Sequence, residues 1–377
     1  MDKQNLLRSA LGIGLLVFTV FLINSGYAIL AQKGPPPPPA NMVPINDLGT
    51  GTYLGYQGGL YPGGSNTLSG TQRDEGLIRA ASIQPLDTNG NPSSSGKIVM
   101  VSAGMSNTTQ EFCSGFNGNI ADQNRSYWPN MTSNTSIQCN TWTFGGQAWA
   151  DPAVNHSALT IVDGAQPGVT ANRWADDSAA PDNPYDTVRN KLTTVGLTVK
   201  QVQIVWMKHA NIKKAGPLQQ GFATSEAVNL EKQQGTTLRL MKNRWPNLKM
   251  VFISTRTYGG YSLDTINPEP YAYESGFGTK WLIEDQINQM AGAGVDAQGG
   301  DLNYDTVAPW VAWGAYLWAN DNNARSDGLT YVASDFDAFD GRHPSQSGEQ
   351  KVGTLLLNFF KTSPYTQCWF LTGATCP

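Results

Sequence analysis

The chain has 377 residues, of which 40% are hydrophobic and 14% are charged, and its formal net charge is −4. A chain of this length can bury one substantial core or at most two, and we interpret it as one main domain behind an N-terminal segment. The slight acidic excess excludes a basic face of the kind that binds nucleic acid, so we expect no nucleic-acid partner.

The first 31 residues predict export. Lys3 and Arg8 precede an apolar run over residues 10–23, and residues 24–28 offer small side chains at the positions that a signal peptidase recognises. Residues 29–31 extend the apolar stretch to the roughly 20 residues that a membrane-spanning helix needs, so an uncleaved anchor stays an alternative. We therefore expect a secreted or cell-envelope protein, with a membrane tether if the segment is retained.

Two further segments precede the main domain. Five consecutive prolines at residues 35–39 make residues 32–45 a stiff, extended linker. Residues 46–95 are rich in Gly, Pro, Ser and Asn and carry repeated turn signals. They predict an irregular N-terminal arm with one short helix near residues 75–81.

Over residues 96–365, apolar runs alternate with amphipathic segments. Four runs are compact and rich in branched residues, like strands that are buried on both faces of a parallel sheet. These runs are residues 97–101, 158–162, 202–207 and 248–253. Helices are predicted at residues 185–194, 224–244, 280–290 and from Ser347 onward. The alternation predicts an α/β domain of three α/β/α layers with a central, mostly parallel sheet.

The four cysteines fall into two pairs that are close in the sequence. In an exported protein the expected disulfides are Cys113 with Cys139 and Cys368 with Cys376, although four cysteines permit three connectivities. The second pair would close a C-terminal tail over residues 366–377. The cysteine and histidine spacings match no zinc motif, so we expect no metal site.

Two short segments near opposite ends of the domain carry the residue types of a nucleophile and its base. Ser106 follows the first apolar run, and Asp340 lies three residues before His343 in Asp-Gly-Arg-His-Pro-Ser. A serine hydroxyl needs an imidazole to take its proton and a carboxylate to fix the tautomer of that imidazole. The chain has only three histidines. His209 is expected at a strand end and His156 lies in a polar run, so His343 is the main candidate base.

The residues that follow three predicted strands are expected to meet at one edge of the sheet, because parallel strands end on the same side. Ser106, Gly168 and Asn211 follow the first, second and third strands and offer a hydroxyl, a glycine amide and a side-chain amide. Thr108 to Glu111 form a capping box, so a helix should begin one or two residues after Ser106. The positive end of that helix would point toward the site.

These blocks resemble those of the SGNH, or GDSL-like, hydrolases over roughly residues 97–360. Gly-Met-Ser-Asn at residues 104–107 resembles the first block, Gly168 the second, Asn211 the third and Asp-Gly-Arg-His-Pro at residues 340–344 the last. Two departures stand out. Met105 takes the place of a common aspartate, and Lys-His-Ala-Asn replaces Gly-x-Asn-Asp in the third block, which leaves the third assignment open by one or two positions.

The resemblance implies a flavodoxin-like fold, a serine esterase activity and a set of roles. Ser106 would be the nucleophile, His343 the base and Asp340 the carboxylate that orients it. The oxyanion hole would consist of the backbone N–H groups of Ser106 and Gly168 and the side chain of Asn211. The resemblance also implies that the protein uses no cofactor.

Members of this superfamily cleave carboxylic esters, often acetyl groups on carbohydrates. We therefore expect an exported, monomeric serine esterase that forms an acyl-enzyme intermediate on small acyl esters, with carbohydrate O-acetyl esters as substrates. Glu274, Trp310 and Trp313 are candidate substrate residues, although the tryptophans could equally pack in a core. Two alternatives are an O-acyltransferase with the same triad and a catalytically idle surface module that binds glycans.

Overall fold

The structure is a computed structural model that describes residues 42–115, 138–178, 183–212 and 215–376. The chain divides into two units, residues 1–33 and residues 34–377, and all described residues belong to the second. The predicted signal or anchor segment and most of the proline-rich linker therefore lie outside the described residues. Within the described ranges, no helix combines the length and the apolar character that crossing a membrane requires.

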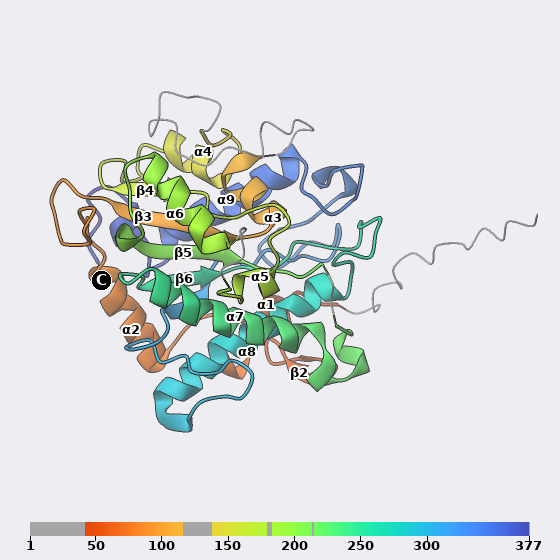
Figure 1. The fold of residues 1–377 in the computed structure, drawn as a ribbon. Helices are drawn as coiled ribbons and strands as arrows, with labels where there is room; N and C mark the ends of the chain where they lie inside the picture. The colour runs from red at the N-terminus through yellow and green to blue at the C-terminus, as the bar shows by residue number, and fades with distance from the viewer. Residues whose placement is uncertain (1–41, 116–137, 179–182, 213–214, 377) are drawn as a thin grey trace, which may run out of the picture. The chain divides into compact units, whose positions relative to one another are not determined.

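A five-stranded sheet forms the centre of the described fold (Figure 1). Its strands are β3 (Ile98–Gly104), β4 (Leu159–Val162), β5 (Val202–Lys208), β6 (Met250–Ile253) and β7 (Trp310–Trp313). All neighbouring strands are parallel, in the order β4-β3-β5-β6-β7. Every residue of these strands is buried, as expected for a sheet with helices on both faces. The order corresponds to 2-1-3-4-5, the flavodoxin-like arrangement, so the predicted fold class is confirmed.

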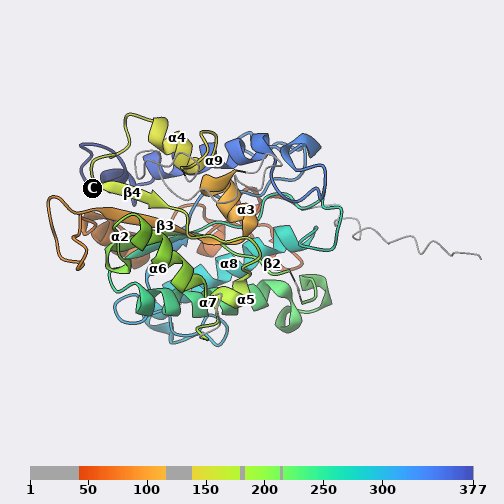
Figure 2. The same ribbon diagram turned by 45° about the horizontal axis from the view of Figure 1, so that its top comes forward.

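Helices cover both faces of this sheet (Figure 2). One face carries α4 (Phe144–Ala150) and α9 (Gln346–Thr362), and the other carries α6 (Pro184–Thr194), α7 (Glu226–Arg244) and α8 (Tyr271–Asn288). Among the described helices, α8 begins well before the predicted residue 280. Gly276 and Gly278 disfavour a helix in isolation, but a Cβ at Gly278 would lie 2.2 Å from the carbonyl oxygen of Ala227 in α7. Glycine therefore lets these two helices approach closely.

Strand β7 is absent from the sequence-based prediction because two of its four residues are tryptophans that could either bind substrate or pack in a core. The burial of both side chains matches the second alternative. Trp310 is 0% exposed and Trp313 is 3% exposed. Their indole N–H groups donate to the carbonyl oxygens of Gln72, at 2.9 Å, and Leu60, at 2.6 Å. Both rings are therefore core residues that anchor the N-terminal arm, and neither is available to stack on a sugar.

In the structure the N-terminal arm begins at residue 42, and it contains α1 (Ile45–Leu48), β1 (Thr52–Tyr53), β2 (Tyr56–Gln57) and α2 (Gly70–Ala81). It packs on the last third of the chain, where the Ile45 N–H donates to Tyr316 Oη at 3.3 Å and Asn320 Nδ2 donates to the Met42 carbonyl at 3.0 Å. Helix α2 lies at the edge of the sheet, where Gln72 Nε2 donates to the carbonyl of Val311 in the edge strand β7 at 3.1 Å. This contact keeps the edge strand from pairing with another chain.

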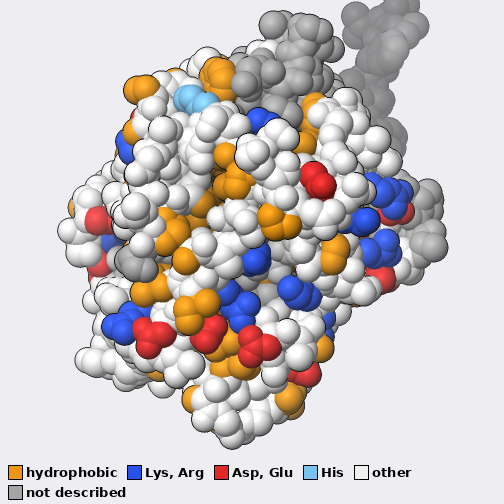
Figure 3. Space-filling model, turned by 90° about the vertical axis from the view of Figure 1, so that its left-hand side faces the viewer, with side chains coloured by type: hydrophobic (Ala, Val, Ile, Leu, Met, Phe, Trp, Pro, Cys, Tyr) orange, Lys and Arg blue, Asp and Glu red, His pale blue; other side chains and the backbone are white. Residues whose placement is uncertain are grey.

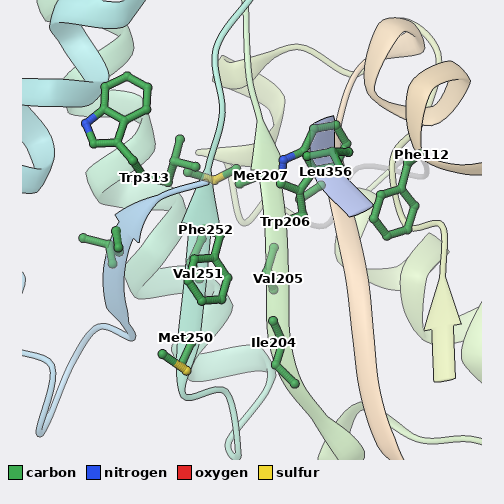
Figure 4. Packing of buried hydrophobic residues seen from close by; sticks show 14 of the residues in the cluster. Phe112, Ile204, Val205, Trp206, Met207, Met250, Val251, Phe252, Trp313 and Leu356 are labelled. Atoms are coloured by element: carbon green, nitrogen blue, oxygen red, sulfur yellow. The ribbon is translucent and has the colours of Figure 1, made fainter. Parts of the chain in front are cut away.

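The core beside β5 and β6 fixes the helices that lead to and from the sheet edge (Figure 4). Phe112 stacks on Trp206 of β5, with ring centroids 5.4 Å apart. Phe252 of β6 meets Phe360 of α9 edge to face at 5.7 Å. The first contact holds the segment that follows Ser106 against the sheet, and the second holds α9 against it.

Both predicted disulfides are present, Cys113–Cys139 and Cys368–Cys376. The first ties the segment after Ser106 to the residues before α4 and the second closes the C-terminal tail. On the face drawn in Figure 3, lysine and arginine side chains are intermingled with aspartate and glutamate, and no patch of one sign is seen on that face.

Candidate active site

Ser106 lies at the carboxyl end of the inner strand β3, where the strand turns into a helix. Helix α3 (Ser106–Thr109) follows the extended residue Met105 and continues as a π-helical turn over Gln110–Ser114. Ser106 is partly exposed, whereas the residues on both sides of it are buried. Gly104 permits the tight turn, since a Cβ there would lie 2.3 Å from the carbonyl oxygen of Lys208. The turn thus presents this one hydroxyl at the sheet edge.

The predicted capping box does not cap this helix, which starts at Ser106 itself rather than after it. Thr108 Oγ1 instead donates to the carbonyl oxygen of Lys208 at 2.8 Å, and Glu111 forms a buried ion pair with the Lys208 ammonium. The first N–H groups of a helix have no acceptor within it and carry its positive end. The backbone N–H of Ser106 is one of these groups.

Ser106, His343 and Asp340 form one hydrogen-bonded line. Ser106 Oγ lies 2.7 Å from His343 Nε2, and His343 Nδ1 lies 2.5 Å from Asp340 Oδ2. The backbone N–H groups of Arg342 and His343 both donate to Asp340 Oδ1 at 3.0 Å. Burial alone would raise the pKa of Asp340, but the hydrogen bonds from His343 and Arg342 hold that pKa well below its usual value. Asp340 therefore stays ionised beside the imidazole.

The loop after β6 supports the loop that carries Asp340 and His343. The Leu263 N–H donates to the Asp340 carbonyl at 2.9 Å, and Arg342 Nε donates to Asp264 Oδ2 at 2.9 Å. Gly341 has a φ of 64°, and a Cβ there would lie 1.9 Å from the Tyr261 carbonyl oxygen. Only glycine suits this turn, because it tolerates a positive φ and leaves room for the neighbouring loop.

Asn211 follows β5 as predicted, but its side chain is engaged in hydrogen bonds with residues other than Ser106 and His343. Its Nδ2 donates to Glu226 Oε1 and Gln233 Oε1, both at 2.7 Å, and its Oδ1 accepts the N–H of Asn172 at 3.2 Å. In this geometry both amide hydrogens are used, so none is left for an oxyanion. The predicted role of Asn211 is therefore corrected to that of a tie between the loop after β5 and helix α7.

Gly168 lies in an exposed turn after β4. The Val169 N–H donates to the Gln166 carbonyl at 3.2 Å, and Gly168 has a φ of 77° behind Pro167. Proline followed by a glycine with positive φ is the pattern of a type II turn. The Gln166 N–H also donates to the Gly104 carbonyl at 3.0 Å, which ties this turn to the end of β3. An oxyanion role for the Gly168 N–H stays a prediction.

Glu274 and His209, which the sequence analysis also considered, are both buried inside the domain. Glu274 is 1% exposed, and its two oxygens accept the Tyr53 hydroxyl at 3.0 Å and the Leu218 N–H at 2.8 Å. Burial raises the pKa of Glu274 to about 7. Glu274 therefore anchors the N-terminal arm, and this structural role replaces the predicted role in substrate binding.

His209 is buried against Trp174, and burial lowers its pKa to about 3.

Sequence reasoning missed the buried polar residues beneath the site. Asn107 Nδ2 donates to the Arg342 carbonyl at 2.8 Å, and Arg256 Nη1 donates to Asn107 Oδ1 at 2.7 Å. Asn107 and Arg256 are 3% and 5% exposed. Only the position of Asn107 directly after Ser106 could have drawn attention to it, because its partners lie 235 and 149 residues away in the sequence.

Within the described residues, one group of acidic side chains is close enough to hold a metal ion. Glu231, Asp285 and Asp296 each offer an oxygen, and these atoms lie within 4.8 Å of one another. Burial and the adjacent Asp285 carboxyl raise the pKa of Glu231 to about 9.

We expect Glu231→Gln to flatten the pH dependence of stability. Glu231 has its ordinary pKa of 4.5 in the unfolded chain and a pKa of about 9 in the folded chain. Folding therefore takes up a proton between these values, and this contribution to the free energy of unfolding is lost as the pH rises through that window. Thermal midpoints at pH 5, 7 and 9 measure it, with Glu75→Gln as a matched control. Parallel curves for the wild type and Glu231→Gln would contradict the prediction.

Comparisons with known proteins give similarities of structure. No protein-family model matches the sequence, and no curated protein matches it either. A putative GDSL-like lipase from Parabacteroides merdae has a TM-score of 0.33 and 13% identity, over 70% of this chain and 95% of the other. A catalytic mutant of an acetylxylan esterase from Geobacillus stearothermophilus has a TM-score of 0.33 and 13% identity, over 69% of this chain and 92% of the other. A protein from Bacillus subtilis has a TM-score of 0.34 and 11% identity. The match covers 72% of this chain but only 57% of that protein.

Proposed function

We propose that this chain is a serine esterase of the SGNH, or GDSL-like, type that hydrolyses small acyl esters. The observation that carries the proposal is the line from Ser106 through His343 to Asp340 at the carboxyl end of a parallel sheet. In open parallel sheets this edge is where ligands bind. The order of the three residues along the chain is also the order of the superfamily's blocks.

The proposed reaction has two halves. In the first, His343 Nε2 takes the proton of Ser106 Oγ as that oxygen attacks the acyl carbon, and the same imidazole then gives the proton to the departing alcohol. In the second, a water loses its proton to His343 and attacks the acyl-enzyme, which releases the acid and restores the serine. Asp340 keeps the proton on Nδ1 and stabilises the imidazolium that forms in each half.

The tetrahedral intermediates need hydrogen-bond donors for their oxyanion. We assign this role to the backbone N–H of Ser106 at the start of α3 and to that of Gly168, each expected to contribute about 3 kcal/mol to transition-state stabilisation. Asn211 is left out because Glu226 and Gln233 accept both of its amide hydrogens.

The substrate class and the compartment complete the proposal. The preference for acetyl groups, with carbohydrate O-acetyl esters as substrates, follows from the resemblance of the sequence blocks. The idle glycan-binding module is disfavoured, because Trp310 and Trp313, which would have bound the sugar, are buried. Export to the cell envelope or medium is supported by two disulfides, which persist in oxidising compartments.

The test compares hydrolysis of p-nitrophenyl acetate with that of p-nitrophenyl octanoate by the full-length protein. We expect kcat/KM for the acetate to exceed that for the octanoate by about tenfold or more. A pocket that fits an acetyl group would exclude the longer chain, and a single methylene can change the ratio of two kcat/KM values by about 10-fold or more. A faster octanoate reaction would move the substrate class to lipid esters. Folded protein with no hydrolysis of either ester, and no labelling by a fluorophosphonate, would favour the idle module.

A further inference from the structure

We propose that Asn107 is a positioning residue that locks the loop of the acid and the base onto the helix of the nucleophile. The inference rests on the proposed function, because it assigns Asn107 a part in the Ser106 reaction. Asn107 directly follows Ser106 in the first turn of α3 and is 3% exposed. Its side chain bonds both to the loop that carries Asp340 and His343 and to Arg256, which follows β6.

The first contact joins the two catalytic segments. Asn107 Nδ2 donates to the carbonyl oxygen of Arg342, the residue before His343, at 2.8 Å. This bond runs beside the bond of 2.7 Å between Ser106 Oγ and His343 Nε2. Two adjacent residues of α3 thus hold two adjacent residues of the loop, one through the side chain that reacts and one through the backbone. The second bond limits the movement of the His343 backbone relative to the serine.

The second contact fixes the orientation of the amide. Arg256 Nη1 donates to Asn107 Oδ1 at 2.7 Å, and Arg256 is itself 5% exposed. A guanidinium only donates and a backbone carbonyl only accepts, so the amide oxygen must face Arg256 and the amide nitrogen must face Arg342. A flipped amide would oppose donor to donor and acceptor to acceptor. The Asn107 side chain therefore has one stable orientation, which is the one that binds the loop.

A positioning role predicts more than a loss of stability. A displacement of about 1 Å at a reacting group can cost about 100-fold in rate. For comparison we choose Asn107→Leu, which removes the bond to Arg342 and the bond from Arg256, and Thr108→Val, which removes a buried bond of the same helix to the carbonyl of Lys208. Thr108 is 1% exposed and has no bond to the loop of His343.

With p-nitrophenyl acetate and the full-length protein, we expect Asn107→Leu to lower kcat by about 10- to 100-fold with KM within about twofold of the wild type. Thr108→Val should keep kcat within about twofold of the wild type, while its thermal midpoint falls because a buried hydrogen bond is lost. Equal kcat values for the two variants would overturn the proposal and leave Asn107 with a structural role. If Asn107→Leu does not fold, Asn107→Asp takes its place, because a carboxylate accepts from Arg256 but cannot donate to Arg342.

A second readout separates this proposal from the proposed function. The Nδ1 proton of His343 should give a low-field NMR signal, assigned by its loss in His343→Ala. We expect that signal to persist in the wild type and Thr108→Val and to broaden or vanish in Asn107→Leu. A wild type without esterase activity would end the proposed function but leave this test intact. An unchanged signal in Asn107→Leu would overturn the positioning role.

Discussion

Replacing Ser106 with alanine is expected to lower kcat for p-nitrophenyl acetate by about 10⁴-fold or more, with the thermal midpoint close to that of the wild type. Ser106 Oγ is the hydroxyl that lies within hydrogen-bonding distance of His343 Nε2, so its removal ends the route through an acyl-enzyme. Initial rates measure the loss. Labelling with a fluorophosphonate, read by intact mass, should vanish in the same variant.

Ser102→Ala is the matched control, because Ser102 is another serine near the end of β3, the strand that leads to Ser106. Its Oγ donates to Asp163 and accepts the N–H groups of Gly164 and Ala165 at 3.1 Å, and the residue is 0% exposed. Its loss should cost about 1–3 kcal/mol of stability without removing the label. Hydrolysis that survives in Ser106→Ala, or a label that is lost in Ser102→Ala, would move the nucleophile elsewhere.

The second large effect is expected for Asp340→Asn, which should lower kcat by about 10⁴-fold. The asparagine amide can donate to His343 Nδ1, and the proton then sits on Nε2, where the imidazole can no longer accept the proton of Ser106. The fall should appear in kcat and kcat/KM together, since the interaction forms with the transition state.

Asp337→Asn provides a control in the same loop. Asp337 Oδ1 accepts the Phe339 N–H at 2.7 Å, and its side chain does not join the line of Ser106, His343 and Asp340. We expect its kcat to stay within a few-fold of the wild type. A loss of less than about tenfold in Asp340→Asn would mean that another group orients the imidazole.

The sheet was predictable where strands are runs of branched residues, and less so elsewhere. β3, β4, β5 and β6 match the predicted apolar runs within a few residues. β7 was missed because tryptophans in a short run fit a cleft as well as a core. The start of α8 was missed because Gly276 and Gly278 argue against a helix until Ile45 packs on the first and α7 on the second.

In the candidate site too, some residues could be predicted from the sequence and others could not. Ser106, Asp340 and His343 could be found because Asp340 and His343 are close in sequence and histidine is scarce in this chain. Asn211 was placed at the right sheet edge, but the acceptors that take its hydrogens come from α7, 15 and 22 residues later. The link of Asn107 to Arg256 joins residues 149 apart, which no local pattern predicts.

The N-terminal arm can dock only after the last third of the chain has been synthesised. Its contacts from Ile45 to Tyr316, from Met42 to Asn320 and from Asp47 to Ser326 span 271, 278 and 279 residues. The arm is made early and its partners are made late, so it must wait undocked while most of the chain is translated. Contacts of such long range form late and leave apolar residues such as Ile45 exposed meanwhile. A chaperone that shields this segment would therefore be expected to raise the yield of folded protein.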